Sequence, residues 1–349
     1  MPQSVPRKRT RSSSSVPRRY NIREVALAAK VSVATVSRTL QMPELVTPET
    51  RQQVQETIDR LGYTPNLQAR NLRTARSYMV VALVPDISNP FFAEVIRGIE
   101  QVAHQHRYAV LLGDTQNSPE RERTYASLVD ARQADGLITL LPHVPKISLP
   151  GRQPIVNACE YVRDKAVTSV YVNNEAAAQQ ATAHLLSLGH RDIALITGPM
   201  TRPISVDRDR GYETALKAAG IKRSPALTAA GDFSIESGIR AMESLLSRGN
   251  KFTAVFCCND EMAMGAICAL KAHGRSVPQD VSVVGFDDIR FARYFDPPLT
   301  TVAQPKGDLG KESMTMLLEI MSGVDVPARK RVLPTQFVVR GSTARRKSP

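Results

Sequence analysis

The sequence predicts an α/β protein with a small all-α unit at its N-terminus, followed by two doubly wound α/β subdomains. Apolar residues between Ile22 and Leu61 recur with the period of short helices. From Tyr78 onward, buried-strand runs alternate with helical segments, which is typical of parallel sheets covered by helices. The 349 residues are too many for one simple core and fit two or three domains.

The first 19 residues are rich in Ser, Pro and Arg and show no hydrophobic period, so we expect a disordered basic tail. Residues 1–76 hold 14 Lys and Arg against 5 Asp and Glu, whereas the rest of the chain holds 32 against 28. A basic segment on a nearly neutral body indicates a polyanion partner for that segment. A solvated tail without a target would give a similar count.

Residues 20–65 predict three short helices. Apolar residues at i, i+3, i+4 and i+7 from Ile22 indicate the first helix. After a short turn, Ser32 is a plausible N-cap for a second helix that runs to about Leu40. Thr47-Pro48-Glu49 supplies a cap, a proline and an acid for a third helix that ends near Leu61. This arrangement describes a helix-turn-helix unit, and residues 66–77 follow it as a short helical stretch and linker.

The second helix is built from small and β-branched residues, which are weak helix formers. Small side chains let a helix backbone approach the major groove of DNA closely. Hydroxyl and guanidinium groups suit phosphates, and Val33 and Ala34 suit base edges or thymine methyl groups. The residues expected at DNA are Ser32, Val33, Ala34, Thr35, Ser37 and Arg38. The alternative is an ordinary small helix facing a core; we expect this for Val36 and Leu40, and Val33 stays open.

The remainder of the chain alternates between the two kinds of element. Expected strands are 78–85, 108–114, 136–141, 154–159, 169–173, 193–199, 254–260 and 281–288. Expected helices are 91–106, 119–132, 175–190, 208–220 and 261–274. With this many units, two doubly wound sheets fit better than one.

Several classes of protein are excluded. No run approaches the roughly 20 apolar residues of a membrane span, and the N-terminus lacks the apolar core of a secretory signal, so we expect a cytoplasmic protein without membrane contact. Sequence motifs of nucleotide-binding loops, nucleophile elbows and zinc proteases are missing, and His184 and His190 do not form a metal pair. We expect no enzyme activity, no cofactor and no metal. The four cysteines have no metal-site spacing and are expected to be buried thiols.

A resemblance extends over residues 20–343. The N-terminal unit, EVALAAKVSVATVSRTL followed by TPETRQQVQETIDRLGYTPNLQARNLR, resembles the headpiece of the lactose/galactose repressor family of bacterial transcription regulators. The motifs that continue it include VPDISNPFFAEVIRGIE, HLLSLGHRDIALITGP, GDFSIESG, TAVFCCNDEMAMGA and VPQDVSVVGFDDI. The resemblance implies an effector-binding and dimerisation core of periplasmic-binding-protein type over 78–349. Its N-subdomain would span about 78–173 and 305–331, and its C-subdomain about 174–304 and 332–343.

The same resemblance implies how DNA is bound. Residues 66–73 match the family's hinge helix, which folds on operator DNA, and Leu72 matches a leucine that opens a base step from the minor groove. Asn66 and Ala69 belong to the same expected contact set. Val33-Ala34 matches the pair of residues with which members of the family choose their operator. The partner would be double-stranded operator DNA, read by a homodimer with one half-site per headpiece.

The effector is expected in a cleft between the two subdomains. By motif match, its contact residues would be Phe91, Phe92, Arg202, Arg208, Phe233, Asn259 and Asp287. From the residues alone, the two adjacent phenylalanines could be core, Asp287 could cap a turn, and Arg208 could be a solvated arginine at a helix start.

The effector expected there is a small sugar- or nucleoside-like molecule. The later motifs, FDDIRFARYFDPPLTTVAQPK and GDFSIESG, resemble those of purine- and nucleoside-responsive members, and the earlier VPDISNPFFAEVIRGIE is similar to ribose- and cytidine-type regulators. Ile204 stands where purine-responsive members carry a hydrogen-bonding threonine, so a nucleoside or pentose is favoured. A non-regulatory binding protein is the competing interpretation, and the basic N-terminal unit argues against it.

Overall fold

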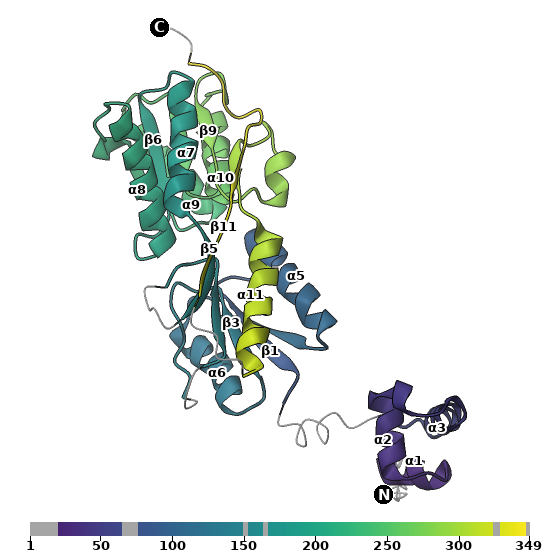
Figure 1. Cartoon of the computed structure of the whole chain (residues 1–349). Helices are drawn as coiled ribbons and strands as arrows, with labels where there is room; N and C mark the ends of the chain where they lie inside the picture. The colour runs from purple at the N-terminus through teal and green to yellow at the C-terminus, as the bar shows by residue number, and fades with distance from the viewer. Residues whose placement is uncertain (1–19, 65–75, 149–152, 163–166, 324–328, 347–349) are drawn as a thin grey trace, which may run out of the picture. The chain divides into compact units, whose positions relative to one another are not determined.

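The computed structural model describes residues 20–64, 76–148, 153–162, 167–323 and 329–346. They belong to two compact units that divide between Ala75 and Arg76 (Figure 1). In the described segments, no helix is long and apolar enough to cross a membrane. Asn66, Ala69 and Leu72, and most of the expected hinge stretch, lie outside the described residues.

The first unit contains the three predicted helices, α1 (Ile22–Ala28), α2 (Val33–Gln41) and α3 (Pro48–Leu61), with a 3-10 turn, η1 (Pro43–Leu45), between α2 and α3. Local caps fix where they begin. The Ser32 hydroxyl accepts the N–H of Thr35, which confirms the predicted N-cap of α2. Asn21 and Glu24 form a capping box at the start of α1 that the sequence analysis did not anticipate.

The helices of the first unit enclose a small apolar core. Its buried members are Val25, Ala26, Ala29, Val36, Val54, Ile58 and Tyr63. Val36 is fully buried, as predicted, while Leu40 is only partly buried against this core. Val33 is 41% exposed, so the interpretation that placed it in the core is wrong.

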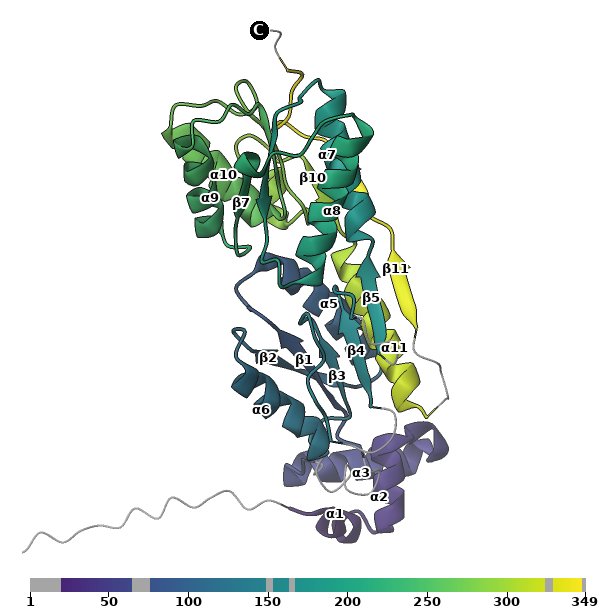
Figure 2. The same ribbon diagram turned by 90° about the vertical axis from the view of Figure 1, so that its left-hand side faces the viewer.

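The second unit begins with a parallel sheet of strand order β11-β5-β4-β3-β1-β2. Its strands are β1 (Met79–Val84), β2 (Ala109–Asp114), β3 (Gly136–Thr139), β4 (Ile155–Ala158), β5 (Thr168–Val172) and β11 (Lys330–Leu333). α6 (Pro119–Asp130) covers one face, and α5 (Pro90–Gln105) and α11 (Lys306–Met321) cover the other (Figure 2). Successive residues of β1 point to opposite faces of the sheet. Val81 and Leu83 pack in the core beneath α6. The alternate residues pack in the core beneath α5 and α11: Val80, Ala82 and Val84.

A second parallel sheet has the order β7-β6-β8-β9. Its strands are β6 (Ile193–Thr197), β7 (Thr228–Ala230), β8 (Ala254–Cys257) and β9 (Ser282–Val284). α7 (Asn174–Ser187) packs with α8 (Pro203–Ala218), and α9 (Ile235–Ser247) packs with α10 (Asp260–Ala272), as separate helix pairs around the sheet (Figure 2). Short elements complete the unit: η2 (Pro225–Leu227), η3 (Arg290–Arg293), and an antiparallel pair of β10 (Thr301–Ala303) with β12 (Gln336–Val338).

The chain passes between the two sheets after β5, after β10 and again after β11. Each sheet is therefore completed by segments that are distant in sequence. The expected helix 208–220 begins earlier than predicted, at Pro203, and α9 and α11 were not predicted. Three cysteines are buried as expected, but Cys268 on α10 is exposed, so that prediction is wrong for this residue.

Candidate functional site

The N-terminal part of α2 presents small side chains to the outside of the first unit. Ser32, Val33, Ala34 and Arg38 are exposed, while Thr35 and Ser37 are half-buried. Val36 points into the core, so the helix has one inward and one outward face. The two hydroxyls at the start of the helix are 2.9 Å apart and hold the cap, which leaves the outward backbone turn accessible. The geometry allows close approach of this turn to a flat or grooved partner.

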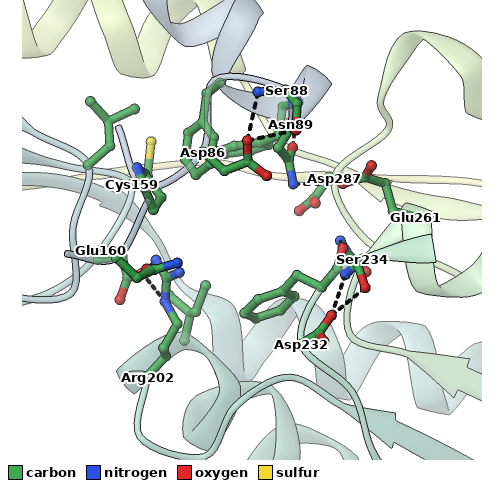
Figure 3. A pocket seen from close by; sticks show the side chains of 18 of the residues that line it. Asp86, Ser88, Asn89, Cys159, Glu160, Arg202, Asp232, Ser234, Glu261 and Asp287 are labelled. Carbon is green, nitrogen blue, oxygen red and sulfur yellow. Dashed lines mark hydrogen bonds and ion pairs between the residues drawn. The ribbon is translucent and has the colours of Figure 1, made fainter. Parts of the chain in front are cut away.

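The second unit contains a cavity of about 410 Å³ where strands end and helices begin (Figure 3). Segments following β1, β3 and β4 of the first sheet contribute to it, as do those following β7 and β8 of the second. The helices α5, α9 and α10 start at this cavity, capped by Asn89, Ser234 and Asn259. Ligands of open α/β sheets bind at such carboxyl ends of strands.

All of the residues expected at the effector line this cavity: Phe91, Phe92, Arg202, Arg208, Phe233, Asn259 and Asp287. Ile204 lines it as well. The two adjacent phenylalanines are also members of the main core, with rings in an edge-to-face pair at 5.3 Å. Both rings therefore belong to the core and also line the cavity, because the cavity wall is the edge of the core.

Arg208 is buried in the second turn of α8, which excludes a solvated arginine at a helix start. Its Nε donates to Asn174 Oδ1 at 2.9 Å, its Nη1 donates to the carbonyl of Cys258, and its guanidinium lies 3.7 Å from the ring centre of Phe286. Burial lowers the pKa of Arg208, and the nearby carboxylate of Asp287 opposes this. The side chain is fixed by protein contacts before any ligand binds.

Asp287 stands 3.7 Å from the Nη2 of Arg208 and accepts a 2.7 Å hydrogen bond from Gln304 Nε2. Its backbone has φ +115°, a left-handed conformation that is rare for a residue with a side chain. Burial raises the pKa of Asp287 to about 6, and Arg208 opposes the rise. The neighbouring Asp288 forms a 2.7 Å ion pair with Arg340, so the two adjacent acids have different partners.

Phe233 forms another wall of the cavity and depends on a glycine. A Cβ at Gly198 would lie 2.2 Å from the Phe233 ring, so only glycine lets the ring take this position. The guanidinium of Arg202 lies 5.7 Å from the same ring centre and pairs with Glu160. Asn259 caps α10 by accepting the N–H of Met262 and donates to the carbonyl of Phe233 at 2.8 Å.

Sequence reasoning did not identify several polar residues of this cavity. Asn89 Nδ2 donates to Glu261 Oε2 at 2.7 Å, and Glu160 accepts from Arg202. Each contact joins a residue of the first subdomain, which contains β1 and β4, to one of the second, which contains β6 and β8 (Figure 3). Burial, with the charge of Asp287, raises the pKa of Glu261 to about 7. Within the described segments, no group of His, Cys, Asp and Glu side chains is placed to hold a metal ion.

Comparison with known proteins separates the same two regions. Residues 21–66 match the family of bacterial regulatory proteins called lacI, and residues 182–343 match a periplasmic binding protein-like domain. The chain is 40% identical to the HTH-type transcriptional repressor CytR of Escherichia coli (strain K12) over 329 residues, which is 92% of this chain and 96% of that repressor.

Two solved structures resemble the chain. The lac repressor dimer bound to operator and the anti-inducer ONPF gives a TM-score of 0.82 at 27% identity, over 94% of this chain and 100% of that chain. A LacI family transcriptional regulator from Enterococcus faecium with bound ribose gives a TM-score of 0.69 at 31% identity, over 77% of this chain and 100% of that chain. The chain belongs to the lacI family of bacterial regulatory proteins, and it is a DNA-binding regulator of transcription rather than an enzyme.

Proposed function

We propose that the outward face of α2 reads operator DNA in the major groove. The observation that supports this most directly is the exposure of Val33 and Ala34 at the start of α2, where no bulky side chain holds the backbone away from the bases. Val33 and Ala34 would contact base edges or thymine methyl groups. Ser32, Thr35, Ser37 and Arg38 would contact phosphates and so fix the position of the helix. Asn66, Ala69 and Leu72 remain part of this proposal on sequence grounds.

Selection of binding sites from random double-stranded DNA tests this proposal. Full-length protein should enrich a pseudo-palindromic site, because a homodimer presents two headpieces. Val33→Ala should change the preferred base at one position of each half-site, by about 1–3 kcal/mol. Leu27→Ala is the matched control, since Leu27 is 83% exposed on α1 and is not a proposed contact. An unchanged site preference in Val33→Ala would defeat the proposed reading role.

Phosphate contacts have a separate signature. Arg38→Ala should weaken binding by a similar factor on all sequences and should reduce the dependence of log affinity on log salt by about one per protomer. Loss of affinity for the selected site alone would instead indicate a base contact for Arg38.

The cavity would bind a small sugar- or nucleoside-like effector, with a nucleoside or a pentose as the favoured class. Its volume is in the range of small-molecule sites, and the rings of Phe91, Phe92 and Phe233 can cover the faces of a base or sugar. The ribose bound by the Enterococcus faecium relative is a pentose. Arg208 and Asp287 would add charge-assisted hydrogen bonds to hydroxyl or ring-nitrogen groups.

Effector binding would control DNA binding by shifting the population of two arrangements of the subdomains. Asn89–Glu261 and Glu160–Arg202 join the subdomains across the cavity, so a ligand placed between them changes their separation. Coupling of about 1–3 kcal/mol changes operator affinity 5- to 150-fold. This control would act on a homodimer in the cytoplasm, where operator DNA is found, through the segment 66–73.

Thermal unfolding with nucleosides, bases and pentoses would identify the effector class, because a ligand at 100 times its Kd stabilises the folded state by about 2.7 kcal/mol. Removing residues 1–76 should abolish operator binding and keep the thermal shift. Operator binding that survives this truncation would refute the assignment of DNA binding to the headpiece.

A further inference from the structure

Glu160 has a carboxylate oxygen that the described part of the protein leaves without a partner. Glu160 follows β4, its side chain is 2% exposed, and it lines the cavity. Its Oε1 accepts from both Nε and Nη2 of Arg202 (Figure 3). Its Oε2 is buried and has no hydrogen-bond partner among the described residues. Burial raises the pKa of Glu160, and the charge of Arg202 opposes the rise. A buried acidic oxygen without a hydrogen-bond partner is costly, so a native structure that keeps one calls for an explanation.

Arg202 cannot serve the second oxygen as it stands. Both of its contacting N–H groups are directed at Oε1, and its guanidinium is also held beside the Phe233 ring. Turning the guanidinium toward Oε2 would break these contacts. With no other donor among the described residues in reach of Oε2, an occupant of the cavity that Glu160 lines is the remaining source of a donor.

The charges that line the cavity limit which class of ligand can occupy it. Its acidic lining residues are Asp86, Glu160, Asp232, Glu236, Glu261 and Asp287. Arg202 and Arg208 are the basic residues lining it within the described segments, and both are engaged by protein acceptors. Three of the helices that begin at the cavity, α5, α9 and α10, are capped by Asn89, Ser234 and Asn259, which each accept a first-turn N–H of their helix. α8 also begins there, and its N-cap residue Arg202 makes no capping hydrogen bond through its side chain. A phosphate group would meet carboxylates without a free cation among these residues.

We infer that Glu160 is a specificity-determining residue for the effector. Its Oε2 accepts a hydrogen bond from an N–H or O–H group of an uncharged ligand, and the acidic cavity rejects the phosphate ester of that ligand. This inference rests on the proposed function, because it assumes that the effector occupies this cavity. The donor is either the exocyclic amine of a base or a hydroxyl of a pentose, and the two sources are separated by experiment.

Calorimetric titration of the full-length protein measures the affinities of nucleosides that differ by one donor group. Adenosine is compared with purine riboside, which lacks only the amine, with 2′-deoxyadenosine, which lacks one hydroxyl, and with AMP. Cytidine, pyrimidin-2-one riboside, 2′-deoxycytidine and CMP form a second series. Each series is run on wild type, on Glu160→Gln and on the control Glu243→Gln, which removes the same charge from an exposed residue of α9 that does not line the cavity.

We expect deletion of one donor to weaken binding to wild type about tenfold or more, as for a hydrogen bond to a charged group. In Glu160→Gln the same deletion should cost threefold or less, because the amide accepts only a neutral hydrogen bond. Glu243→Gln should keep the wild-type factor. AMP or CMP should bind wild type at least tenfold more weakly than its nucleoside. A merely structural role of Glu160 would change all affinities together and leave these ratios unchanged.

Equal deletion factors in wild type and Glu160→Gln would overturn the inference, as would a nucleotide that binds as tightly as its nucleoside. If Glu160→Gln does not fold, Glu160→Asp, which withdraws the carboxylate by one methylene, makes the same comparison. If none of these probes binds, the ligand class assigned through Glu160 is wrong. Operator binding by the same preparation, measured in parallel, decides separately whether the regulatory function stands.

Discussion

Gly211 lies where α8 packs on α7, and adding a single methyl group there should disturb both stability and the effector site. A Cβ at this position would lie 2.2 Å from the carbonyl oxygen of Glu175, whereas ordinary contact begins at 3.4 Å, so the helices must separate by about 1 Å. Overpacking of this kind costs about 3 kcal/mol, of which about 1 kcal/mol is recovered because alanine favours the helix. The net loss of about 2 kcal/mol should lower Tm by roughly 4–8 °C.

The same displacement should weaken effector binding. Arg208 on α8 donates to Asn174 on α7 at 2.9 Å, and a shift of about 1 Å takes this pair beyond hydrogen-bond distance. We therefore expect about tenfold lower effector affinity in Gly211→Ala by calorimetry. Gly307→Ala is the control, since no atom lies within 4 Å of its added Cβ in α11, and it should keep or raise Tm. Wild-type stability in Gly211→Ala would refute the close-packing argument.

Three further changes test the packing and the charges. Val36→Ala removes two methyl groups from a fully buried site, so headpiece stability should fall by about 2 kcal/mol in circular dichroism melts, and a variant as stable as Val33→Ala would contradict this. Tyr212→Phe deletes the 2.8 Å hydrogen bond to the buried carbonyl of Ile193, and urea unfolding should show a loss of about 1–2 kcal/mol; no loss would mean that water replaces it. The pKa of Glu261 is about 7 in the folded state and 4.5 ordinarily, so between these pH values the folded protein binds a proton that the unfolded chain does not. The stability that the neutral carboxyl group contributes is therefore lost as the pH rises from 4.5 through 7. Glu261→Gln keeps an acceptor for Asn89 without the charge, so its Tm should exceed that of wild type at pH 8 and approach it near pH 5; a constant difference would refute the titration.

Local signals explain which helices could be predicted. The caps at Ser32 and Thr47 and the proline at the start of α3 act within one turn, so the sequence shows them directly. α9 carries comparable signals in Ser234 and Glu236, yet it was not predicted. β11 carries none: its exposed Lys330 and Arg331 lack any alternating pattern, and it is a strand because it pairs with β5, more than 150 residues earlier in the chain.

The residues of the candidate site also divide into those that local sequence motifs predict and those that depend on contacts distant in sequence. Aromatic and charged residues at strand ends were found by motif, but Glu160 was not, because its partner Arg202 lies 42 residues further along the chain. Asn89 and Glu261 are separated by 172 residues, and no local pattern connects them. Arg208 was placed at a helix start because Pro203 was not taken as the first residue of α8. Distances across a cavity depend on tertiary structure, which periodicity does not encode.

The three passages of the chain between its sheets also limit how this protein can be divided. A fragment that stopped after β5 would lack β11 at one edge of the first sheet and α11 on its face, and would expose the apolar residues they cover. Neither subdomain can be produced from one continuous stretch of the chain. A frameshift late in the gene would therefore damage both subdomains. Three segments that cross side by side between the two subdomains also favour one shared bending motion of the subdomains over independent movements. Such a motion suits an all-or-none response to a ligand.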